Sequence, residues 1–82
     1  MGRYFFHIDN GMDFLDEEGT EVASPDLVLP LAMKTAATMM GEDESLWNGK
    51  ALAVRVVGEA GNLVMMVQLQ SLVIIPTDAE PS

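Results

Sequence analysis

The sequence contains no cysteine, a single histidine, a single tryptophan and only four basic residues. The lack of cysteine excludes a disulfide framework, a thiolate nucleophile and a cysteine-ligated zinc site. Apolar runs are short, since Leu63 to Val67 and Leu72 to Ile75 fall well below the ~20 residues that span a bilayer. No basic segment precedes an apolar run at the start, so we expect no secretory signal and a soluble cytoplasmic protein.

Acidic residues dominate the charge. Thirteen of them against four basic residues give a net charge of -9. This charge repels phosphate backbones and anionic membranes, so we expect neither to be a direct partner. Solubility is the simplest interpretation of the charge, and a dedicated basic partner is the alternative.

The length of 82 residues predicts one domain, because two cores would each be too small to offset chain entropy. We expect an α+β domain over residues 1–76 and a frayed acidic tail over residues 77–82. A domain of this size is only marginally stable alone. Surface buried by self-association would therefore matter.

The first part of the chain predicts a strand, a turn and a short return strand. Residues alternate between two faces from Arg3 to Asp9, and Asn10-Gly11 is a dipeptide typical of tight hairpin turns. A return strand is expected around Met12 to Leu15. Residues 16–22 then predict a loop with a brief extended piece.

A single helix is expected from about Pro25 to Met40. Ser24 offers a capping hydroxyl, and Pro25 suits a first helical turn. Pro30 conflicts with this range, because proline inside a helix costs about 3 kcal/mol. The helix therefore either begins late, near Val28, or is kinked.

A second hairpin follows, with strands from Lys50 to Val57 and from Leu63 to Leu69 around a turn rich in glycine. The whole pattern predicts a two-layer α+β fold in the order strand, strand, helix, strand, strand. One helix would pack on a mostly antiparallel four-stranded sheet with the first strand central.

The outer face of this second hairpin is unusually apolar. Alternation places Val57, Val64 and Met66 there, and Phe5 lies on the same side of the first strand. Exposed apolar patches mark protein contacts, so our leading hypothesis is a noncatalytic module that self-associates, as a homodimer, through this face. The alternative is that Leu72 to Ile75 folds over the patch.

The first hairpin supports a second hypothesis, an acidic regulator or adaptor that binds a basic or nucleic-acid-binding protein through Asp16, Glu17 and Glu18. The same acidic cluster invites comparison with calcium sites. It lacks the spacing of the calcium-binding helix-loop-helix, so a solvated acidic hairpin is the better interpretation and no metal site is expected.

A small enzyme using His7 is the third hypothesis. Asp9 lies on the same strand face and could orient the imidazole, but no motif supplies a nucleophile beside it. A structural role for this histidine is favoured. Trp47 could stack on a ligand, yet a core-capping role is the more common use of such an indole. We expect no cofactor and no small-molecule substrate.

The opening block Arg3-Tyr4-Phe5-Phe6-His7 carries the most specific part of a family resemblance. The other matching positions are Asp16, Glu18-Gly19, Glu21, Asp26-Leu27, Trp47, Gly49, Val57 and Glu59-Ala60-Gly61. Over about Arg3 to Leu69, the sequence resembles a family of short alphaproteobacterial proteins classed as a domain of unknown function, whose members open with this block or a close variant.

Two segments depart from that family. Its helix looks alanine-rich with an arginine, where this chain has Leu29-Pro30-Leu31, and its hairpin turn has an acid before glycine where this chain has Asn10-Gly11. The resemblance implies no activity, cofactor or catalytic residue.

Overall fold

A computed structural model describes residues 2–77 of the chain. The expected frayed tail over 77–82 lies, apart from Thr77, outside the described residues. The elements in chain order are β1 (Gly2–Asp9), β2 (Asp13–Phe14), β3 (Thr20–Val22), the 3-10 helix η1 (Pro25–Leu27), α1 (Val28–Glu42), the 3-10 helix η2 (Glu44–Leu46), β4 (Ala51–Gly58) and β5 (Leu63–Gln70).

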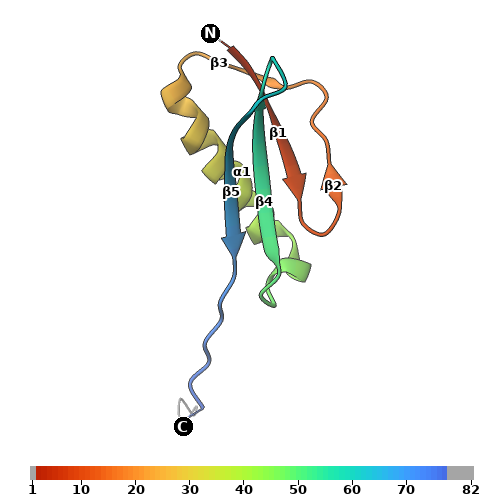
Figure 1. Cartoon of the computed structure of the whole chain (residues 1–82). Helices are drawn as coiled ribbons and strands as arrows, with labels where there is room; N and C mark the ends of the chain where they lie inside the picture. The colour runs from red at the N-terminus through yellow and green to blue at the C-terminus, as the bar shows by residue number, and fades with distance from the viewer. Residues whose placement is uncertain (1, 78–82) are drawn as a thin grey trace.

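The strands form one antiparallel sheet in the order β2-β1-β4-β5, with β3 also paired to β1 (Figure 1). Both short strands lie along the same edge of β1. β3 pairs with its beginning, Gly2 to Tyr4, and β2 with its end, Ile8 and Asp9. The expected α+β fold with a single helix on a sheet is confirmed, and β1 lies inside the sheet. The sheet has five strands and not the expected four, because residues 20–22 pair with β1 as well.

The helix begins late, which removes the conflict with Pro30. Ser24 caps η1 by accepting the Asp26 N–H on its hydroxyl, and α1 starts only at Val28. Pro30 therefore lies in the first turn of α1. Backbone N–H groups in that turn have no partner within the helix, so the missing proton of proline costs little there.

The core lies between α1 and the β4–β5 half of the sheet, the two strands on which the helix packs (Figure 1). Small side chains at Ala32 and Ala36 let the helix approach the sheet closely, and both are fully buried. On the sheet side of this core lie three fully buried residues of β4, Leu52, Val54 and Val56. Tyr4, Phe6 and Ile8 of β1 lie at the margin of this core and are only partly buried.

Candidate interaction surfaces

The sheet face opposite α1 is covered by no helix in residues 2–77, and its residues follow from the strand register. Phe5 pairs with Val57, His7 with Arg55, and Arg55 in turn with Met66. Directly paired residues in an antiparallel sheet point to the same side. These five side chains therefore share the outer face, as the alternation in the sequence predicts.

A β-bulge changes the beginning of β5. The register shifts between Val56 and Val57, so that Val57 lies opposite Leu63 while Val56 lies opposite Met65. Val64 is the extra residue, and its Cγ2 atom lies 3.5 Å from where a Cβ on Gly58 would stand. A bulge places an additional residue on one strand and turns its side chain out of alternation. Leu63 thus takes the place beside Val57 that the sequence alternation assigns to Val64.

Exposure on the outer face increases from β1 towards β5. Phe5 and Val57 are half-buried, whereas Met66 is 54% exposed and Leu63 is 60% exposed. Phe5 is covered by the chain itself, because Gly19 passes directly over its ring. A Cβ built on Gly19 would lie 2.9 Å from Phe5 Cε2. Of the partner-binding candidates, Met66 is therefore the most accessible apolar side chain.

The loop between β2 and β3 is organised by Asp16. Its Oδ2 atom accepts the Phe6 N–H at 3.1 Å, and its Oδ1 atom accepts the N–H groups of Glu18 and Gly19 at 3.2 and 2.9 Å. On this edge of β1, no strand pairs with the residues between β3 and β2, and the Asp16 carboxylate accepts the Phe6 N–H there. Asp16 thus holds the loop against the sheet.

Burial of the Asp16 carboxyl acts to raise its pKa, but the hydrogen bonds from Gly19, Phe6 and Glu18 outweigh burial. The net result is a pKa below the usual value for aspartate. A carboxylate engaged in this way is not free for a partner. Glu17 and Glu18 remain exposed, and they are the accessible acidic side chains of the three expected to bind one.

His7 is tied to the same loop. Its Nδ1 atom accepts the backbone N–H of Asp16 at 3.0 Å, which requires that nitrogen to be unprotonated. Asp9, the expected orienting residue, instead accepts the Gly11 N–H at 3.1 Å on its Oδ1 atom. Among the described residues, no group of three histidine, aspartate or glutamate side chains is arranged to hold a metal ion.

Trp47 closes the end of the helix. Its indole Nε1 donates to the carbonyl oxygen of Met40 at 2.6 Å, while the rest of the side chain is about half exposed at 48%. The carbonyls of the last helical turn have no partner within the helix, and this bond satisfies one of them. The indole therefore serves the helix end, and Trp47 is not among the side chains that pack against the described core.

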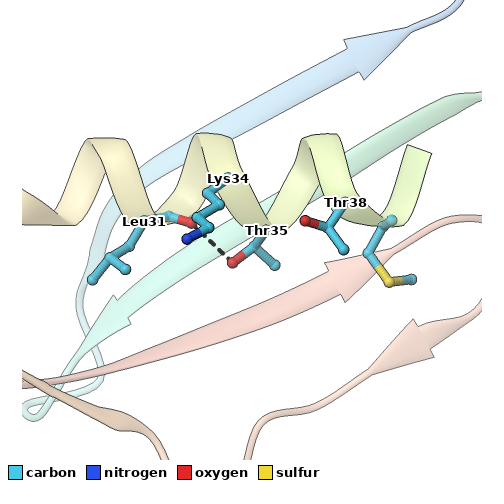
Figure 2. Close-up of a pocket in the computed structure, with 5 residues that line it drawn as sticks. Leu31, Lys34, Thr35 and Thr38 are labelled. Atoms are coloured by element: carbon cyan, nitrogen blue, oxygen red, sulfur yellow. Dashed lines mark hydrogen bonds between the residues drawn. The ribbon is translucent and has the colours of Figure 1, made fainter. Parts of the chain in front are cut away.

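A groove of about 430 Å³ runs along one flank of α1 and is lined by Leu31, Lys34, Thr35, Thr38 and Met39. Figure 2 shows these side chains on one side of the helix, with the Thr35 hydroxyl bonded to the Leu31 carbonyl at 2.9 Å. All of the lining residues come from a single helix. Neither His7 nor Trp47 contributes, so the groove does not join the two candidate ligand residues.

The chain beyond β5 does not cover the outer face. Leu72 to Ile75 extends away from the body in continuation of β5 (Figure 1), and exposure ranges from 66% at Val73 to 84% at Leu72. The alternative in which this segment folds over the patch is therefore wrong. Ser71 anchors the segment, since its hydroxyl donates to the Leu46 carbonyl at 2.8 Å and accepts the Gly49 N–H at 3.2 Å.

Comparison with protein families assigns the chain to one family. Residues 3–70 match a domain of unknown function (DUF6894), and the chain belongs to this family. No curated protein and no solved structure matches it. None of the helices within residues 2–77 has the length and apolar character needed to cross a membrane.

Proposed function

We propose that this domain is a noncatalytic interaction module that self-associates through the apolar outer surface of the β4–β5 hairpin. The observation that supports it most directly is that Met66 is 54% exposed on the outer face of β5. Val57 lies on the same face, on the neighbouring strand β4. Large apolar side chains gathered on an uncovered sheet face are typical of protein contacts. Val64, at the bulge beside them, is 39% exposed.

The size of the domain adds a thermodynamic reason. Its fully buried side chains are few and mostly small, with Leu46 and Leu52 the largest. A small core leaves a small margin of stability. A second copy that contacts the apolar side chains of this hairpin would contribute roughly 25 cal/mol for each Å² of apolar surface removed from water.

The test is the mass of the protein in solution, measured over a range of concentrations. We expect a dimer at micromolar concentration, and a mass that stays at 8.9 kDa up to high micromolar concentration would contradict the proposal. Met66→Glu should shift the protein to the monomer, because it places a charge in the contact. Met12→Glu is the matched control: Met12 is 67% exposed in the turn of the other hairpin, and its substitution should leave the dimer intact.

A second candidate is supported by the exposed pair Glu17 and Glu18. They lie on the β2–β3 side of the sheet, at the opposite edge from β5, so a basic partner bound there would not compete with self-association. Binding of an oligolysine peptide should weaken with added salt and with Glu17→Gln and Glu18→Gln together. Binding unchanged by both salt and substitution would contradict it.

We propose in addition that the protein is cytoplasmic, that its family is alphaproteobacterial, and that the block from Arg3 to His7 is a signature of the family. The enzyme hypothesis for His7 draws no support from the groove on α1, which His7 does not line.

A further inference from the structure

Building on the proposed self-association, we infer that two copies join edge to edge, each adding β5 and the following segment to the sheet of the other. Met65 to Val73 of one copy pairs antiparallel with the same residues of the second copy. Leu69 lies at the two-fold axis. The occupant of the free β5 edge is thus a second copy of this chain.

The β5 edge lacks the features that usually prevent such pairing. Within the described residues, β5 pairs with β4 alone, so its other side presents unpaired backbone groups. Exposed edges are normally blunted by charge or proline. From Leu63 to Ile75 there is neither, and the first proline is Pro76. The bulge at Val64 lies at one end of the segment and leaves Met65 onwards regular.

The absence of charge over these residues is notable in a chain with a net charge of -9. Two copies repel one another over most of their surfaces. A stretch without acidic residues is where they can approach at the lowest electrostatic cost. The opposite edge of the sheet carries Asp13, Glu17, Glu18 and Glu21, so the same repulsion directs association towards β5.

The sequence of this segment is self-complementary about Leu69. In that register Met66 faces Leu72 of the second copy, Met65 faces Val73, and Gln68 faces Gln70. Apolar residues therefore meet apolar residues and amides meet amides, except that Val67 faces Ser71. Moving the axis to Gln68 would place Met66 opposite Gln70, and moving it to Gln70 would place Leu72 opposite Gln68. A two-fold axis at any of these three residues keeps each residue opposite one of the same face, so the choice of Leu69 rests on the side-chain pairs.

The segment after β5 gains the most from this arrangement. Leu72 is 84% exposed in the single chain and Ile74 is 75% exposed, although both are of residue types that favour burial. Paired with β5 of the second copy, their backbone groups would be satisfied and their side chains would extend its apolar face. On the helix side, Leu29 and Met33 lie on the flank of α1 opposite the Leu31 groove, and both are exposed. In the dimer, the side chain of Val73 from the second copy would lie on the same side of the sheet as Leu29 and Met33.

The lack of native cysteine permits a direct test of the register in the full chain. Gln68→Cys and Gln70→Cys variants, one carrying a tag that separates the masses, are mixed and exposed to oxidised glutathione. In the inferred register, residue 68 of one copy lies directly opposite residue 70 of the other, within the distance that a disulfide can bridge. Residue 68 of one copy and residue 68 of the other are two positions apart along the strand, which is too far. We expect mixed disulfide dimers well in excess of the dimers formed by either variant alone.

The possible outcomes separate this inference from the proposal on which it rests. A dimer in solution whose cysteine variants cross-link no better mixed than alone would overturn the edge pairing and leave self-association standing. A monomer at high micromolar concentration would overturn both.

A backbone variant provides the second test. Leu72→Pro removes an N–H from the added strand at a side chain that is 84% exposed in the single chain, so dimerisation should weaken about tenfold or more. Leu72→Val, which keeps the N–H and the apolar side chain, should dimerise as the native protein does. Full dimerisation of the proline variant would contradict the inference.

Discussion

His7 and Asp16 connect β1 to the loop between β2 and β3, and Asp16 both donates a hydrogen bond to β1 and accepts one from it. The Asp16 N–H donates to His7 Nδ1 at 3.0 Å, and the Asp16 carboxylate accepts the N–H of Phe6, the neighbour of His7, at 3.1 Å. Together these bonds occupy the part of β1 between its pairings with β3 and β2. The most conspicuous titratable residue of the sequence thus has a structural partner.

Replacing Asp16 should destabilise the fold. Asp16→Asn can still accept hydrogen bonds on one oxygen, but it loses the charge and one acceptor. These N–H groups are at most partly buried, so the loss of a bond costs about 0.5–1.5 kcal/mol, and the melting temperature should fall by several degrees. Thermal unfolding followed by circular dichroism measures this. Glu17→Gln, at the exposed neighbouring position, should leave the melting temperature unchanged, and equal melting of the two variants would contradict the role of Asp16.

The pKa of Asp16 also predicts a pH dependence. It is lower in the folded protein than the ordinary aspartate value of 3.8, so the folded state binds fewer protons than the unfolded state near that pH. The stabilisation is present above the unfolded pKa and is lost as pH falls through the folded value. Unfolding by urea should therefore show stability declining below about pH 4.

The same titration in Asp16→Asn should give a shallower decline. Part of the slope should remain, because the pKa of Asp43 is lowered too, first by the hydroxyl of Ser45 and then by its N–H. Identical slopes in the native protein and the variant would contradict the assignment to Asp16.

Gly19 should tolerate no side chain. It has a φ of +73°, and a Cβ would lie 2.9 Å from both Arg3 Cγ and Phe5 Cε2. Gly19→Ala should therefore cost the left-handed strain of about 1–2 kcal/mol and a steric clash in addition. Gly61→Ala is the matched control, since Gly61 has a φ of +85° with nothing within 4 Å. Chemical denaturation should rank the glycine 19 variant clearly below the glycine 61 variant.

Loss of the Trp47 indole nitrogen should weaken the end of α1. Trp47→Phe keeps most of the apolar surface but removes the 2.6 Å bond to the Met40 carbonyl, at a cost of about 0.5–1.5 kcal/mol. Hydrogen exchange of the amides in the last helical turn should accelerate. Unchanged exchange there would show that the bond contributes nothing to the helix end.

The orientation of α1 can be tested with one pair of substitutions. Ala36 is fully buried against the sheet, whereas the adjacent Ala37 is exposed. Ala36→Leu should destabilise by about 1–3 kcal/mol through overpacking, while Ala37→Leu should be close to neutral. Denaturant midpoints of the two variants provide the measurement, and a reversed order would contradict the packing described.

Much of the fold follows from local sequence patterns. The alternation from Arg3 to Asp9, the turn at Asn10-Gly11 and the second hairpin are all recovered, because period-two patterning and turn residues act over a few neighbouring positions. The late start of α1 was one of two alternatives that Pro30 left open. The sequence does not predict Thr20–Val22 as a full strand, because a segment of three residues carries too little pattern, and only its pairing with β1 makes it one.

The outer-face residues were predicted less completely. Met66 lies where alternation places it, but the bulge moves Val64 out of the pattern and brings Leu63 opposite Val57. A bulge depends on how two strands fit together, so it leaves no clear signal in one of them. The covering of Phe5 by Gly19 depends likewise on a contact between distant residues.

The sequence by itself determined the net negative charge, the single α-helix and the apolar, uncharged character of the last strand, because these are properties of residues and their near neighbours. The tertiary structure decided that Asp16 serves the backbone, that His7 accepts a structural hydrogen bond, and that Leu72 to Ile75 stays exposed beyond β5. Each of these depends on which distant segments meet, and hydrogen bonds and packing between them exist only after the chain has folded.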